Sequence, residues 1–87
     1  MAQVFIPAQM RDLTSGAAQL ELSGRNVGEI IDALDMRFPG IAGRLCREGA
    51  MAPGIAVAID GVLTPRGLLA AVQPENEIHF LPAIGGG

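Results

Sequence analysis

The sequence contains no lysine, tryptophan or tyrosine, and among its 87 residues it has one cysteine, one histidine and three phenylalanines. A single cysteine, Cys46, excludes an internal disulfide, and one Cys with one His cannot form a structural zinc site. With few aromatic side chains, the chain offers little on which nucleic-acid bases could stack. The net charge of −3 also lacks the basic patch on which nucleic-acid binding depends. We therefore expect no metal, no bound cofactor and no nucleic-acid partner.

Long apolar runs are absent as well. No segment reaches the roughly 20 apolar residues that span a bilayer, and none has the pattern of a secretory leader. We expect a cytoplasmic protein with no membrane partner. Its apolar content of 49% suits one small domain whose core is built from Val, Ile, Leu, Met and Ala. The acidic balance favours a partner with a basic groove.

The first half of the chain predicts two strands and a helix. Residues 4–6 (VFI) form an apolar run before a proline, which is typical of a central strand buried on both faces. Residues 19–22 (QLEL) alternate polar and apolar side chains, as a half-exposed strand does, so we expect a hairpin between the two. Asn26 and Glu29 have the spacing of a helix capping box, and apolar residues follow at helical intervals to Phe38.

The second half predicts three more strands. We expect a short helical turn over 41–45 and an exposed loop over 47–54, which has glycine and proline but no periodicity. Residues 55–60 (IAVAID) then alternate and end at Asp60-Gly61, a strong hairpin signal, so the strand returns through Val62 and Leu63. In the last strand, Ile78 and Phe80 point one way and His79 the other.

This order predicts an α+β fold of the ubiquitin-like β-grasp type. One main helix crosses a face of a small mixed sheet, and the first and last strands lie side by side in its middle. We assign residues 1–81 to the β-grasp domain and residues 82–87 to a flexible C-terminal glycine tail.

Three stretches carry a resemblance to a known family: AQMRDL after the first strand, the helix start NVGEIIDAL, and above all the terminal FLPAIGGG. In these stretches the chain resembles the MoaD, ThiS and CysO group of ubiquitin-like sulfur carriers. The likeness covers nearly the whole chain, and the diglycine that closes a β-grasp pattern is its most specific part.

The resemblance implies a carrier that is not itself an enzyme. Its reactive group is the carboxylate of Gly87, which a ubiquitin-activating-like adenylyltransferase activates with ATP and which becomes a thiocarboxylate. ATP binds that partner, and a sulfur-accepting biosynthetic enzyme is the second partner. Gly85 and Gly86 form the tail that reaches these enzymes. Family members often carry Ala or Ser where this chain has Gly85.

The partner contacts expected beside the tail are its apolar residues. The family pattern places an aromatic residue at Phe80, a proline at Pro82 and an aliphatic residue at Ile84. Neighbouring strand residues point to opposite faces, so at least one of Phe80 and Leu81 faces away from the core. We expect Phe80, Leu81, Pro82 and Ile84 to contact the partners.

Elementary chemistry agrees with an activated terminus. A free α-carboxyl group has a pKa of about 3.5, so it is ionised at neutral pH and is a poor acyl electrophile until it is esterified. Glycines without a Cβ suit a tail that must enter a narrow active site. Cys46 is expected to be a small core residue rather than a nucleophile, and His79 a solvated or partner-facing residue.

Two other functions stay open. One is a protein modifier joined through Gly87 to target lysines, which the chain cannot do to itself because it has no lysine. The other is a plain interaction or regulatory domain with an inert tail. The sequence also leaves the receiving pathway open between cysteine, molybdopterin and another sulfur-containing metabolite.

Overall fold

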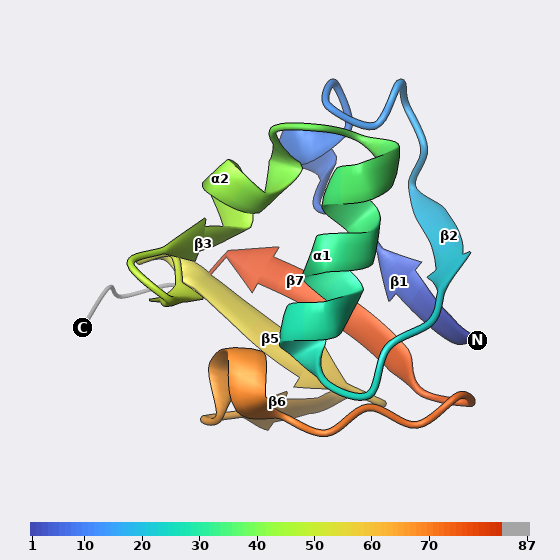
Figure 1. The fold of residues 1–87 in the computed structure, drawn as a ribbon, viewed down its shortest axis with the longest axis vertical. Helices are drawn as coiled ribbons and strands as arrows, with labels where there is room; N and C mark the ends of the chain where they lie inside the picture. The colour runs from blue at the N-terminus through green and yellow to red at the C-terminus, as the bar shows by residue number, and fades with distance from the viewer. Residues whose placement is uncertain (83–87) are drawn as a thin grey trace.

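The computed structural model of the chain describes residues 1–82. Five strands form a mixed sheet in the order β2-β1-β7-β5-β6. They are β1 (Ala2–Phe5), β2 (Gln19–Leu22), β5 (Ile55–Ile59), β6 (Val62–Thr64) and β7 (Glu77–Pro82). The first and last strands, β1 and β7, are parallel neighbours in the middle, as predicted. The other pairs are antiparallel: β2 with β1, β5 with β7, and β6 with β5. Figure 1 shows α1 (Val27–Arg37) crossing one face of this sheet.

The remaining elements are short. Two 3₁₀ turns, η1 (Ala8–Met10) and η2 (Gly67–Leu69), follow β1 and β6. The predicted turn after the main helix is α2 (Ile41–Leu45). Within residues 1–82, none of the helices is long and apolar enough to cross a membrane.

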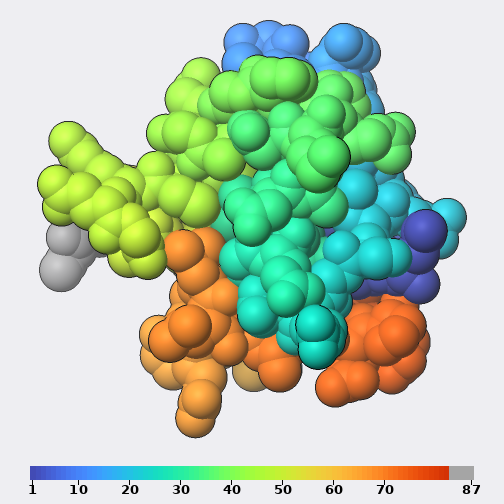
Figure 2. Space-filling model, viewed as in Figure 1, coloured from blue at the N-terminus to red at the C-terminus, as the bar shows by residue number. Residues whose placement is uncertain are grey.

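The segment predicted as an exposed loop is instead a small hairpin. Its strands are β3 (Cys46–Arg47) and β4 (Ala50–Met51), which form a separate two-stranded sheet. The turn between them consists of Glu48 and Gly49, both at positive φ. Because the strands have two residues each, periodicity gave no signal. The hairpin projects from the body of the molecule in Figure 2.

The main helix begins nearly as predicted. The Asn26 side chain accepts a hydrogen bond from the Glu29 backbone N–H at 2.8 Å. The Glu29 carboxylate, however, accepts from the Arg25 N–H rather than from that of Asn26, so the capping box is displaced by one residue. At the other end of α1, Asp35 accepts from the N–H groups of Gly40 and Ala42 and holds the start of α2.

The core lies between the sheet and the two helices. Val4 and Ile78, neighbours in the sheet, are completely buried against the apolar face of α1, which includes Ile30 and Leu34. The core is aliphatic, as expected, except that the aromatic ring of Phe80 is its largest fully buried side chain.

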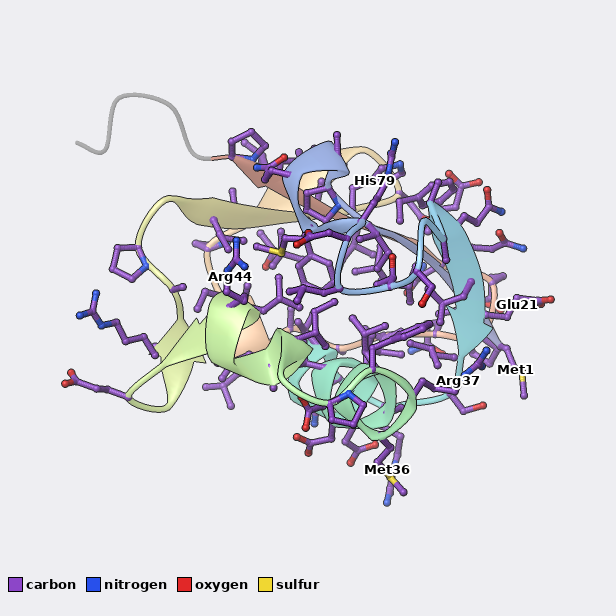
Figure 3. The ribbon with its side chains drawn as sticks, turned by 90° about the horizontal axis from the view of Figure 1, so that it is seen from above. Met1, Glu21, Met36, Arg37, Arg44 and His79 are labelled. Atoms are coloured by element: carbon purple, nitrogen blue, oxygen red, sulfur yellow. The ribbon has the colours of Figure 1, made fainter. Side chains whose placement is uncertain are left out.

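Neither α1 nor α2 covers the other face of the sheet, and we call it the open face. Figure 3 shows both helices on one side of the sheet and His79 on the opposite side. The prediction that residues 4–6 are buried on both faces was therefore wrong in part. Val4 is buried under the helix, but Phe5 points to the open face and is only half-buried.

Candidate functional site

The residues predicted to serve function gather where β7 ends. Phe80, Leu81 and Pro82 are its last three residues. The predicted acyl site Gly87, the tail residues Gly85 and Gly86, and the expected partner contact Ile84 lie outside the described residues, so their roles stay predictions. So does the boundary between a domain of 1–81 and a tail of 82–87.

Phe80 and Leu81 point to opposite faces of the sheet, as the strand period requires. Phe80 is 2% exposed and belongs to the core, whereas Leu81 is 38% exposed on the open face. Phe80 thus offers a partner almost no surface. Its packing instead fixes the end of β7, and with it the position of Leu81.

Pro82 marks the end of the described strand. It lies opposite Ile55, the first residue of β5, in the antiparallel pair of β5 and β7. Proline has no N–H to donate to a neighbouring strand. Pro82 is exposed, as is Leu81, so two apolar side chains are accessible at the end of β7.

A groove of about 360 Å³ borders these residues on the open face. We call it the tail-root groove. Seven of its ten lining residues are apolar. The lining consists of Phe5, Ile6, Pro7, Ala8, Gln9, Arg11, His79, Phe80, Leu81 and Pro82.

The rings of Phe5 and His79 stack in this groove. Their centroids are 4.1 Å apart and their planes 3° apart. The two residues are directly paired in the parallel ladder of β1 and β7, which brings opposite ends of the chain together. His79 was expected to be solvated or partner-facing. It is half-buried and stacks face to face on Phe5, a contact that sequence reasoning missed because the register is not visible in the sequence.

The segment after β1 forms the second wall. Arg11 donates from Nε to the Ile6 carbonyl at 3.1 Å, which ties the segment to the end of β1. The buried Thr14 hydroxyl donates to the Ala17 carbonyl at 2.8 Å and closes the loop further along. Among residues 1–82, Arg25 and Glu29 form the only ion pair. Arg11 is therefore an exposed cation of the groove with no salt bridge to a carboxylate of the described chain.

Cys46 behaves as the core residue that was expected. It is half-buried and packs against the main core. Burial raises the pKa of its thiol above the ordinary value, and the carboxylates of Asp32 and Asp35 raise it further. A thiol with a raised pKa is a weak nucleophile at neutral pH, because only the thiolate attacks.

Elsewhere in the described chain there is less evidence of a functional site. A larger groove, about 430 Å³, lies between the β3–β4 turn and η2, away from the end of β7. Its lining includes Met51, Arg66 and Leu69. Residues 1–82 hold no group of three or more side chains that could bind a metal ion.

Comparison with known proteins gives consistent matches. The model of the ThiS family matches residues 4–87. The sulfur carrier protein CysO of Mycobacterium tuberculosis is 31% identical over 97% of this chain and 96% of its own length. The small archaeal modifier protein 3 of Haloferax volcanii is 29% identical over 70% of this chain and 68% of its own length.

The solved structures that resemble this chain agree with these sequence matches. A chain in the crystal structure of the Amycolatopsis orientalis BexX/CysO complex superposes with a TM-score of 0.91 and 34% identity over the full length of both chains. The crystal structure of M. tuberculosis CysO, at 24% identity over 97% of this chain and all of that one, gives a TM-score of 0.88 and supports the fold. These matches confirm the β-grasp fold and the resemblance predicted from the terminal motif. The chain belongs to the ThiS family, among the ubiquitin-like sulfur carriers of the MoaD, ThiS and CysO group.

Proposed function

We propose that this chain carries sulfur on its C-terminal Gly87 as a thiocarboxylate and donates it to a biosynthetic enzyme. The observation that supports this most is the match of the ThiS family over residues 4–87, which includes the terminal glycines. The chain acts as a co-substrate of its partners rather than as an enzyme.

The chemistry follows from the poor reactivity of a carboxylate. The Gly87 carboxylate attacks the α-phosphorus of ATP in the active site of an adenylyltransferase, and pyrophosphate leaves. Sulfide then attacks the carbonyl carbon of the acyl-adenylate, a C–S bond forms, and AMP leaves as a stable anion. If the donor is a persulfide, a second thiol must reduce the resulting S–S bond to release the thiocarboxylate. ATP is bound by the partner and not by this chain.

The surroundings of the tail support a docking role. Leu81 on the open face and the exposed Pro82 next to it in β7 present apolar surface at the end of the strand, and apolar surface beside a functional group is typical of an interaction site. We propose that Leu81, Pro82 and Ile84 contact both the activating enzyme and the sulfur acceptor. Phe80 supports them from the core. The CysO of A. orientalis was crystallised in a complex with BexX, which supports a carrier that works bound to partner proteins.

Mass spectrometry of the intact chain tests this proposal. The chain is incubated with the adenylyltransferase, ATP and sulfide, and the expected product has one oxygen replaced by sulfur at the C-terminus. A chain that forms no acyl-adenylate and no thiocarboxylate with any such enzyme from its own organism would contradict the proposal.

A second function is favoured by the similarity to small archaeal modifier protein 3. The same acyl-adenylate can react with a lysine amine of a target protein, which gives an isopeptide bond and releases AMP. Target lysines that carry the C-terminal Gly-Gly remnant after digestion would show this reaction. An intact chain with a C-terminal sulfur and no such remnants supports the carrier alone.

A further inference from the structure

We infer that the tail-root groove binds a partner segment that carries a carboxylate, and that this carboxylate pairs with Arg11. The inference deepens the proposed function, on which it rests, by assigning a charge to the partner surface beside the tail. It also reverses the expectation, drawn from net charge alone, that the partner presents a basic groove.

The first step concerns where the groove lies. Leu81 and Pro82 form part of its lining, so an enzyme that takes up residues beyond Pro82 comes close to the groove. The stacked rings of Phe5 and His79 hold each other in place in its lining, which also includes the buried Pro7. Rigid apolar surface of this kind loses little conformational entropy on binding.

The second step concerns charge. Arg11 is exposed, and its Nε is already directed to the Ile6 carbonyl, so the guanidinium is held in place while its terminal N–H groups remain available. No salt bridge joins it to a carboxylate of residues 1–82. A guanidinium fixed in this way is suited to paired hydrogen bonds with a carboxylate.

The third step is the contrast with the other end of the sheet. The acidic side chains of Asp60 and Glu77 lie at the start of β7, opposite the end that leads to the tail. Asp60 is occupied there by hydrogen bonds from the Asn76 side chain and the Glu77 N–H. These two of the nine acidic residues therefore lie at the end of β7 remote from the groove, so the net charge of the whole chain does not by itself give the charge at the groove.

The test is a charge series at Arg11, using the adenylyltransferase that activates the wild-type chain. ATP–pyrophosphate exchange gives kcat and the KM for the carrier, and calorimetry without nucleotide gives the Kd. We expect KM and Kd to rise in the order Arg11→Lys, Arg11→Gln and Arg11→Glu. For Arg11→Glu the expected rise is at least about tenfold, and kcat should change little because the tail is intact.

Arg25→Gln is the matched control. It removes the same charge from an exposed arginine whose one ion pair within residues 1–82 is with Glu29, and it should leave KM unchanged. Thermal unfolding of each variant separates a docking effect from loss of the Ile6 hydrogen bond. Gln9→Glu and Gln9→Lys supply a second pair in the same groove that leaves Arg11 untouched, and we expect the acidic variant to bind more weakly and the basic one more tightly.

Each remaining outcome has a distinct meaning. Tighter or unchanged binding by folded Arg11→Glu would overturn the inference while leaving the proposed function intact, since the wild-type chain is still activated. A defect that appears only when ATP is present would also overturn it, by assigning Arg11 to the nucleotide. Failure of the wild-type chain to be activated would remove the proposed function, and this inference with it.

Discussion

Phe5 and His79 lie face to face across the parallel pair of β1 and β7, with ring centroids 4.1 Å apart. One comes from the first strand of the chain and the other from the last. The contact places the loop that carries Arg11 beside the point where the chain leaves the sheet toward Gly87. The proposed partner surface therefore lies beside the end of β7.

Chain length at the C-terminus should be critical. Adding one residue after Gly87 moves the carboxylate by up to about 3.5 Å, which is enough to remove it from the attacking position in an enzyme site. We expect the extended chain and a chain that lacks Gly87 to form no acyl-adenylate, as measured by ATP–pyrophosphate exchange. Gly85→Ala, which keeps the length, is the control and should remain active. Normal exchange by the extended chain would show that Gly87 is not the acyl site.

Leu81 should contribute to partner binding without supporting the fold. Its side chain is 38% exposed, so Leu81→Asp should weaken binding of the activating enzyme by more than about 1 kcal/mol while the melting temperature changes little. We expect the same of Ile84→Asp from the sequence pattern. Leu69→Asp, at an 80% exposed site in η2, is the control. Titration calorimetry gives the affinities, and unchanged affinity in both variants would remove these residues from the interface.

Phe80, unlike Leu81, should support the stability of the fold. Its ring is 2% exposed in the core, and truncating such a residue typically costs about 3–5 kcal/mol of folding free energy. Urea unfolding should show a loss of this size for Phe80→Ala and a much smaller one for Leu81→Ala. Equal losses in the two variants would contradict the placement of the two side chains on opposite faces.

The Cys46 thiol should resist alkylation. Its pKa is raised by burial first and by Asp32 and Asp35 second, so the folded protein keeps the thiol protonated to a higher pH than an unfolded chain does. The pH profile of the iodoacetamide reaction rate should therefore have a higher midpoint in the folded protein than in denaturant. Asp32→Asn should lower that midpoint by removing one negative charge. A folded-state midpoint at or below the denatured one would be inconsistent with this environment.

The sequence by itself determined the elements whose signals are local. Alternation, the Asn26 cap and the Asp60-Gly61 turn identified the strands of the main sheet and the central helix, because each depends on side chains a few residues apart. The terminal motif was sufficient to identify the family. The same reasoning missed the β3–β4 hairpin, whose two-residue strands are too short to produce a period.

Only the tertiary structure decided which side chains share a surface. Alternation showed that Phe80 and Leu81 point apart, but the side of the sheet that α1 covers determined which of them is buried. Strand register determined that Phe5 meets His79, and the ordered loop after β1 placed Arg11 beside Leu81. Such contacts join residues about seventy positions apart, and they form because burying the aliphatic core fixes the order and register of the strands.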